Sequence, residues 1–185
     1  MVATTPSTIA LTPPCRTLEV TASAALSPGH VAELHSSTGN KVRKNTRAAL
    51  PGTAKLVALE KEYLGKGITD AYASADTVII GVFKPGSEVT LRVAASATAI
   101  VFGDKLECAG DGTVRKQVGY LTDNSGGTAN TTIQDISASP AEAEIANNFA
   151  DVAAAINALG VFAIALEAVD NSGGGSEAFI RALIV

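Results

Sequence analysis

Hydrophobic and polar side chains alternate with a period of two over much of the chain, which is the pattern of half-buried β-strands. The first such stretch places Leu18, Val20 and Ala22 on one side of a strand that begins at Thr17. A near-continuous apolar run at 78–83 is typical of a strand that is covered on both faces. The pattern predicts further strands at 31–35, from residue 42, and at about 54–60, 77–84, 88–95, 105–108, 113–118, 161–169 and 178–185.

Turn-forming residues separate these segments. Pro85-Gly86 predicts a hairpin between 77–84 and 88–95, and Gly110-Asp111-Gly112 predicts one between 105–108 and 113–118. Short strands with frequent turns are typical of barrels and sandwiches. We therefore expect a mainly β fold, a small antiparallel β-barrel or sandwich over residues 17–185.

Residues 1–16 predict an extended N-terminal arm. Pro6, Pro13 and Pro14 remove backbone donors and disfavour helix, and Thr and Ser residues lie between them. The arm is either a disordered terminus or a segment that becomes ordered along a neighbouring subunit. In the second case Ile9 and Leu11, two residues apart and so on one side of an extended chain, are its candidate contacts with a partner.

One segment breaks the β pattern and predicts an inserted α-helix at about 139–160. Ser139-Pro140-Ala141-Glu142 forms a capping box with proline at the first helical position, and Gly160 provides a stop. The large apolar residues of this segment are spaced as in a heptad seam. They are candidate oligomer-interface residues: Ile145, Phe149, Val152, Ile156 and Leu159. The seam either packs on the chain's own barrel or associates with copies of itself around a symmetry axis.

Composition limits the range of functions. The chain has 185 residues, a formal charge of −4, 4% aromatic residues and no Trp. The charge argues against general nucleic-acid binding, and the scarcity of aromatic residues argues against stacking pockets for sugars or bases. Two cysteines, Cys15 and Cys108, favour a reducing compartment without a disulfide scaffold, and we expect each to be a buried small hydrophobe. No signal-peptide or membrane-span pattern is present, so we expect a soluble protein made in the cytoplasm with no membrane partner.

The sequence offers little for catalysis or metal binding. His30 and His35 are the two histidines, and neither has a nucleophile or a metal-ligand pair at a recognisable spacing. The loop at 170–177 is rich in oxygen-bearing side chains but has few acidic residues for calcium, so a hairpin tip is the better interpretation. We therefore predict a non-enzymatic protein with no catalytic, cofactor-binding or metal-binding residues and no cofactor.

Short internal repeats are visible. The segments 29–44 and 103–116 each contain a strand, a glycine turn and the triplet Val-Arg-Lys, at 42–44 and 114–116. They fit repeated hairpin construction but are too short to establish a duplication.

Two stretches, 67–89 and 102–114, carry a resemblance. The first includes Gly67-Ile68-Thr69-Asp70-Ala71-Tyr72 and the run from Val78 to Val89, and the second pairs Phe102-Gly103-Asp104-Lys105-Leu106 with Asp111-Gly112-Thr113-Val114. Together with the closing segment 165–185, they resemble the capsid decoration, or cement, proteins of tailed bacteriophages. The helical segment resembles helices of phage head-fibre and decoration proteins more loosely.

The resemblance implies a structural role on the virion. Decoration proteins bind the outside of an assembled phage head, often as homo-trimers, and stabilise contacts between subunits of the major capsid protein. The expected partner is therefore the phage major capsid protein, and the expected location is the capsid exterior after assembly in the host cytoplasm. The alternative is a head-fibre or adhesin-like binding module on the virion surface.

Overall fold

The computed structural model describes residues 6–35, 39–48, 55–118 and 160–185. The chain divides into two compact units, one of residues 1–117 and 160–185 and the other of residues 118–159. The first unit holds all described residues but Val118. The helix expected at about 139–160 lies outside the described residues, except for Gly160. Its five apolar positions also lie outside them: Ile145, Phe149, Val152, Ile156 and Leu159.

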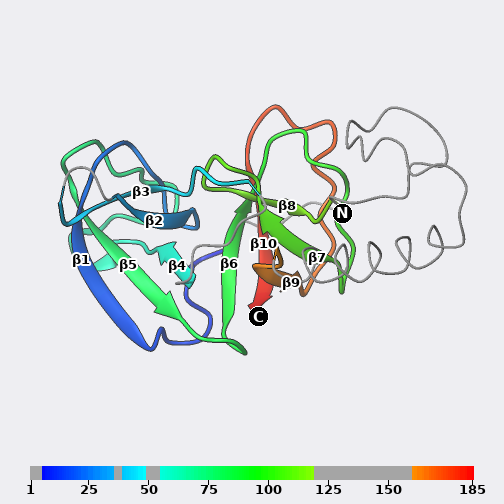
Figure 1. The fold of residues 1–185 in the computed structure, drawn as a ribbon, viewed down its shortest axis with the longest axis horizontal. Helices are drawn as coiled ribbons and strands as arrows, with labels where there is room; N and C mark the ends of the chain where they lie inside the picture. The colour runs from blue at the N-terminus through cyan, green and yellow to red at the C-terminus, as the bar shows by residue number, and fades with distance from the viewer. Residues whose placement is uncertain (1–5, 36–38, 49–54, 119–159) are drawn as a thin grey trace, which may run out of the picture. The chain divides into compact units, whose positions relative to one another are not determined.

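The described part of the chain is mainly β, as predicted, and its strands form two closed barrels of five strands each (Figure 1). Barrel one has the strand order β1-β3-β2-β4-β5. Its strands are β1 (Arg16–Ala22), β2 (Val31–His35), β3 (Lys41–Lys44), β4 (Lys55–Ala58) and β5 (Thr77–Phe83). A short 3₁₀ helix, η1 (Glu62–Leu64), lies between β4 and β5 in the sequence.

Barrel two has the strand order β10-β6-β8-β7-β9. Its strands are β6 (Glu88–Val93), β7 (Lys105–Cys108), β8 (Val114–Lys116), β9 (Ala163–Ala165) and β10 (Ala178–Ile184). The strand pattern predicts one barrel or sandwich, whereas the structure has two small barrels within one compact unit.

The two barrels have the same topology. In barrel one, β1 pairs in parallel with β3 and antiparallel with β5, β2 pairs with β3 and β4, and β4 pairs with β5. In barrel two, β6 pairs in parallel with β8 and antiparallel with β10, β7 pairs with β8 and β9, and β9 pairs with β10. Each strand of barrel one thus has an equivalent five strands later.

The strand registers also match. Glu33 lies opposite Arg43 and their side chains form an ion pair at 2.7 Å; Glu107 lies opposite Arg115 in the equivalent place, with an ion pair at 2.8 Å. The two Val-Arg-Lys triplets are therefore equivalent strands, β3 and β8. The chain contains two copies of one structural repeat, which the short sequence repeats alone could not establish.

The turns that precede β2 and β7 repeat in the same detail. Gly29 and Gly103 both have positive φ, 86° and 85°, and donate their N–H groups to Ala58 O at 2.8 Å and Ala165 O at 2.9 Å. The residue after each glycine closes the turn with its side chain. His30 Nδ1 accepts the N–H of the residue three before it, and a carboxylate oxygen of Asp104 does the same in the second turn.

The predicted hairpin across Pro85-Gly86 is wrong. β5 pairs with β1 and β4, while β6 pairs with β8 and β10, so this turn connects the two barrels. A tight turn between two apolar segments has the same local sequence whether the strands pair with each other or diverge. The hairpin predicted across Gly110-Asp111-Gly112 is confirmed by the antiparallel pairing of β7 with β8.

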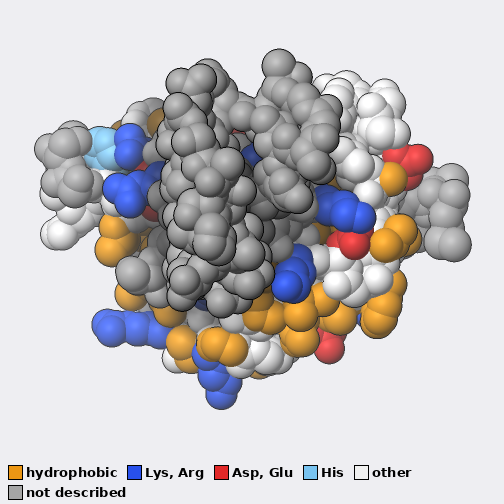
Figure 2. Space-filling view, turned by 45° about the vertical axis from the view of Figure 1, so that its right-hand side comes forward, with side chains coloured by type: hydrophobic (Ala, Val, Ile, Leu, Met, Phe, Trp, Pro, Cys, Tyr) orange, Lys and Arg blue, Asp and Glu red, His pale blue; other side chains and the backbone are white. Residues whose placement is uncertain are grey.

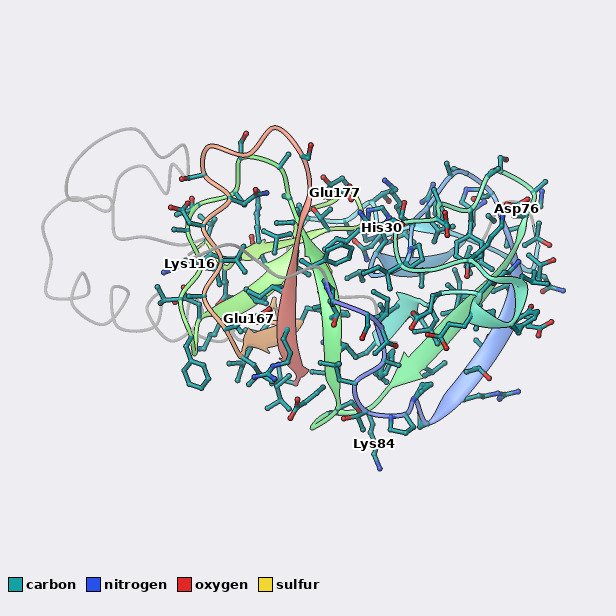
Figure 3. The ribbon with its side chains drawn as sticks, turned by 180° about the vertical axis from the view of Figure 1, so that it is seen from behind. His30, Asp76, Lys84, Lys116, Glu167 and Glu177 are labelled. Carbon is teal, nitrogen blue, oxygen red and sulfur yellow. The ribbon has the colours of Figure 1, made fainter. Side chains whose placement is uncertain are left out.

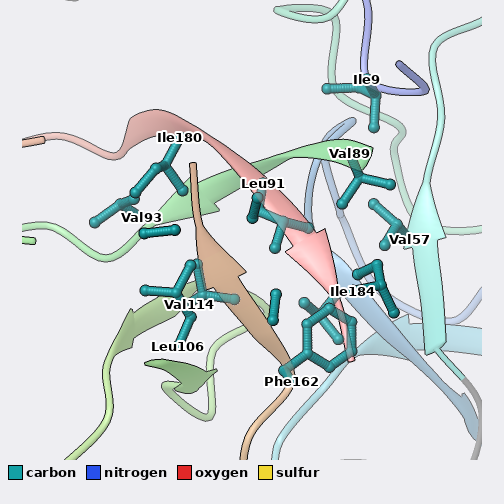
Figure 4. Close-up of a cluster of buried hydrophobic side chains, with 14 of the residues drawn as sticks. Ile9, Val57, Val89, Leu91, Val93, Leu106, Val114, Phe162, Ile180 and Ile184 are labelled. Carbon is teal, nitrogen blue, oxygen red and sulfur yellow. The ribbon is translucent and has the colours of Figure 1, made fainter. Parts of the chain in front are cut away.

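The hydrophobic core has two clusters. One lies within barrel one and includes Val42 and Ile80. The other fills barrel two and extends into barrel one through Val31 and Val57 (Figure 4). The second cluster therefore joins the barrels by continuous apolar packing as well as by the covalent connection.

The equivalent glycines provide a matched test of this junction. A Cβ at Gly29 would lie 3.2 Å from Arg92 Cγ and 3.5 Å from the Phe179 ring, whereas a Cβ at Gly103 would meet no atom within 4 Å. Both substitutions to alanine incur the cost of a left-handed backbone, about 1–2 kcal/mol. We expect Gly103→Ala to lower the free energy of unfolding by about that amount and Gly29→Ala by about 1–3 kcal/mol more, because its neighbours must move. Urea unfolding of the two variants measures the difference, and equal losses would contradict the close packing at Gly29.

Candidate functional site

Within the segment predicted as an N-terminal arm, which is described from Pro6 onward, residues 9–12 lie on barrel two of their own chain. The O of Ile9 accepts the N–H of Thr90 at 2.8 Å, and Thr12 N–H donates to Glu88 O at 2.9 Å, so the arm adds to the edge of β6. The side chain of Ile9 is fully buried in the core cluster that joins the barrels. Ile9, one of the two candidate contacts, is thus packed within this chain.

Leu11, the other candidate contact, has an exposed side chain, 41% accessible. Ile9 and Leu11 do not share one environment, although two residues apart on an extended chain should lie on the same side. The carboxylate of Glu60 holds the start of the arm, since it accepts the Thr8 hydroxyl and, at 3.1 Å, the N–H of Ile9. This links the arm to the segment that leads into η1.

Two large side chains of η1 are exposed on that adjoining segment. Tyr63 is 67% accessible and Leu64 is similarly exposed. Together with Leu11 they form what we call the arm surface: Leu11, Tyr63 and Leu64. An exposed tyrosine with exposed aliphatic side chains on linked segments is suited to contact with another protein, because aromatic side chains contribute strongly to the energetics of protein interfaces.

A polar cluster lies at the junction of the two barrels, where Figure 3 shows His30 and Glu177 side by side. His30 Nε2 donates to the Glu177 carboxylate at 3.0 Å, and Arg92 forms an ion pair with the same carboxylate at 2.9 Å. Arg92 also donates to Pro28 O at 2.7 Å and Ile68 O at 3.0 Å. Barrel one supplies the imidazole and the carbonyls, and barrel two supplies the arginine and the carboxylate.

Both ionisable partners have shifted pKa values. Burial lowers the pKa of His30 below its usual 6.5, against the opposing effect of Glu177. The hydrogen bond from His30, followed by its charge and the contacts of Arg92, lowers the pKa of Glu177 to about 2. His30 Nδ1 accepts the N–H of Ser27 at 2.8 Å, which fixes the proton of the neutral ring on Nε2. The arrangement uses both ring nitrogens in hydrogen bonds, so the cluster serves to hold the barrels together.

No pattern in the amino-acid sequence indicates this cluster. Its members are separated by up to 147 residues, and His30 has no charged neighbour within its own turn. The loop at 170–177, considered for calcium, instead contributes Glu177 to the junction. The side chain of Asn171 cross-links the same loop by donating to Ala94 O at 2.8 Å and Ser176 O at 3.0 Å.

The two cysteines differ. Cys108 is buried, and burial raises the pKa of its thiol to about 12, as expected for an inert core residue. Cys15 is exposed, which corrects the expectation that both are buried; it precedes β1 at the end of the arm, where its side chain reaches Val82 O at 3.0 Å. Both cysteines are free thiols.

Among the described residues, no group of three or more His, Cys, Asp or Glu side chains is placed to hold a metal ion. In the same part of the chain, no helix has the length and apolar character needed to cross a membrane. A comparison with models of known protein families finds no match, and a comparison with curated protein sequences finds no similar protein.

Proposed function

We propose that this chain is a structural decoration protein that binds the outer surface of a phage head and stabilises contacts between major capsid subunits. The observation that carries the proposal is the arm surface: Leu11 exposed on the fastened N-terminal segment, and Tyr63 and Leu64 exposed on η1. The resemblance of 67–118 and 161–185 to phage decoration proteins supports the same assignment.

The way the arm is anchored supports a binding role. Ile9 is buried, and Thr8, Ile9 and Thr12 are hydrogen-bonded to barrel residues, so Leu11 is held between fixed points. A contact residue that is already ordered loses little conformational entropy on binding. Many copies on one shell multiply a modest affinity per contact, and a homo-trimer would add avidity.

The test is co-sedimentation of the purified chain with empty heads assembled from its cognate major capsid protein. We expect the wild type to co-sediment and to raise the melting temperature of the heads. Leu11→Asp and Tyr63→Asp should each weaken binding by about tenfold or more, because they place a charge in an apolar contact.

Ala99→Asp is the matched control, since Ala99 is exposed on the loop after β6, outside the arm surface. It should bind as the wild type does. A wild-type chain that stays in the supernatant at every concentration would refute the decoration role. Equal binding by all three variants would keep the role but exclude the arm surface as the contact.

A further inference from the structure

The contact between the two barrels has two distinct sides. On barrel one it consists of the turn at 27–30 with Val31, which we call the turn face. On barrel two it consists of Arg92, Phe179 and the tip of the β7–β8 hairpin at Gly112, which we call the tip face. Val31 N–H donates to Gly112 O at 2.7 Å, and a Cβ at Gly29 would touch both Arg92 and Phe179.

Because the barrels are copies of one repeat, each has a turn face and a tip face. The strand registers place Val101–Asp104 and Lys105 of barrel two at the positions of the turn face. They place Thr21, Thr77 and Asn40 of barrel one at the positions of the tip face. The contact inside the chain uses one face of each kind, and the described residues leave one of each kind uncovered.

The unused turn face of barrel two is apolar and open. Phe102 is 72% accessible and Val101 is 54% accessible. The residue equivalent to Phe102 in barrel one, Pro28, is buried under barrel two. Figure 2, in which the right-hand side of Figure 1 comes forward, shows hydrophobic side chains gathered toward the lower right of the described surface.

The unused tip face of barrel one is open and polar at Thr77 and Asn40, and the neighbouring strand β2 adds one apolar side chain, Leu34. Leu34 is 64% accessible, whereas its equivalent in barrel two, Cys108, is buried. Leu18 and Val20, on the β1 strand that carries Thr21, are partly buried. Their equivalents in barrel two, Val89 and Leu91, are fully buried in the cluster that joins the barrels. Among the described residues, nothing buries these positions of barrel one as fully as their equivalents in barrel two are buried.

We propose that the turn face of barrel two in one copy binds the tip face of barrel one in a second copy. This contact would repeat between chains the contact already made within the chain. A second copy is the occupant because the described part of each chain leaves one face of each kind uncovered, and these two faces match the two that are joined inside the chain. Such a head-to-tail contact forms a closed ring where its rotation closes and an open chain where it does not.

The contact between chains is weaker than the one within the chain. Thr21 stands where barrel two has Arg92, and Ala75 stands where it has Glu177, so the ion pair of the junction is not repeated. The apolar side chains at 34, 101 and 102 supply the binding energy. Self-association is therefore concentration-dependent, and it requires no capsid.

Two single-face variants test the proposal by analytical ultracentrifugation of the full chain. Phe102→Asp removes the turn face and keeps the tip face, while Leu34→Asp does the reverse. Wild-type protein should associate with rising concentration, and each variant alone should raise the dissociation constant by about tenfold or more. An equimolar mixture of the two variants should form a dimer of one to one composition that does not grow further, because one intact face of each kind remains.

Tyr63→Asp is the matched control, an exposed apolar side chain outside both faces, and should associate as the wild type does. Circular dichroism and melting temperature show that each variant is folded. A wild type that stays monomeric at all concentrations overturns the proposal. A mixture that fails to form the dimer also overturns it. Unchanged association of Leu34→Asp overturns it as well, because that result indicates a contact between two turn faces. None of these results depends on capsid binding, so this proposal and the decoration role fail separately.

Discussion

Glu177→Ala is expected to lower the free energy of unfolding by about 3 kcal/mol at pH 7, because it leaves the Arg92 guanidinium in a largely buried site without its carboxylate. Arg92 and Glu177 have side chains that are 12% and 29% accessible, and they pair at 2.9 Å. The same substitution removes the acceptor of the His30 Nε2 proton. The lost stability comes from the junction between the barrels, where the Glu177 carboxylate binds both His30 and Arg92.

Urea unfolding measures this loss, and Glu62→Ala is the control. Glu62 is exposed at the start of η1 and should change the unfolding free energy by no more than about 0.5 kcal/mol. If the two variants unfold at the same urea concentration, the junction cluster contributes nothing beyond an ordinary surface carboxylate.

The junction also makes stability depend on pH. The pKa of His30 is lowered on folding, so the unfolded chain binds a proton more readily, and stability present above pH 6.5 is lost as the pH falls below that value. The pKa of Glu177 is lowered from 4.5 to about 2, so its contribution is lost below pH 4.5. Both effects have the same sign, and acid weakens the junction in two stages.

His30→Asn separates the two stages. An asparagine oxygen can accept the turn N–H as Asp104 does in barrel two, while the imidazole whose pKa is lowered on folding is gone. The unfolding free energy of the variant should vary less than that of the wild type between pH 6.5 and 5. A slope equal to that of the wild type would assign the acid sensitivity to other groups.

The sequence predicted the individual strands well, because each is a short segment with its own periodicity. Leu18, Val20 and Ala22 alternate in sequence and lie on β1, and the apolar run at 78–83 lies on β5. The pairing of the strands could not be predicted in this way, because it depends on residues far apart in the chain. Pro85-Gly86 reads as a hairpin turn, and only the partners of β5 and β6 show that it joins two barrels.

The duplication was visible in fragments but could not be established from them. Val-Arg-Lys recurs because β3 and β8 are equivalent, yet most equivalent positions differ in residue type, as His30 and Asp104 do. The two residues perform the same task, accepting a turn N–H, through different chemistry. Equivalence of hydrogen bonds and register survives such changes, and sequence similarity does not.

The arm illustrates the remaining limit. Ile9 and Leu11 were paired because alternate residues of an extended chain share a side. In the structure, Ile9 enters the core between the barrels while Leu11 stays exposed. Which surface an arm lies against is decided by its pairing with β6, and the local pattern contains no information about that partner. The candidate contacts of the arm are accordingly reduced to Leu11, and Tyr63 and Leu64 of η1 are the other exposed residues of the arm surface.

Phe162→Ala is expected to cost about 4 kcal/mol of unfolding free energy, the range for truncating a fully buried phenylalanine. Phe162 is one of the largest fully buried side chains among the described residues and belongs to the cluster that joins the barrels (Figure 4). The Lys55 ammonium lies 4.7 Å above its ring and donates to Val161 O at 3.2 Å. By register, Lys55 and Phe162 occupy equivalent places in the two repeats, so the substitution also removes a contact between them.

Phe102→Ala is the matched control, the same change at a side chain exposed on the unused turn face. It should change the unfolding free energy by no more than about 0.5 kcal/mol when measured at a concentration where the chain is monomeric. The comparison isolates burial, since the residue type, the substitution and the barrel are the same. A loss of less than about 1 kcal/mol for Phe162→Ala would show that this cluster is not the packed core that holds barrel one to barrel two. The proposed contact between chains would then lose its support, because it is inferred from the contact within the chain.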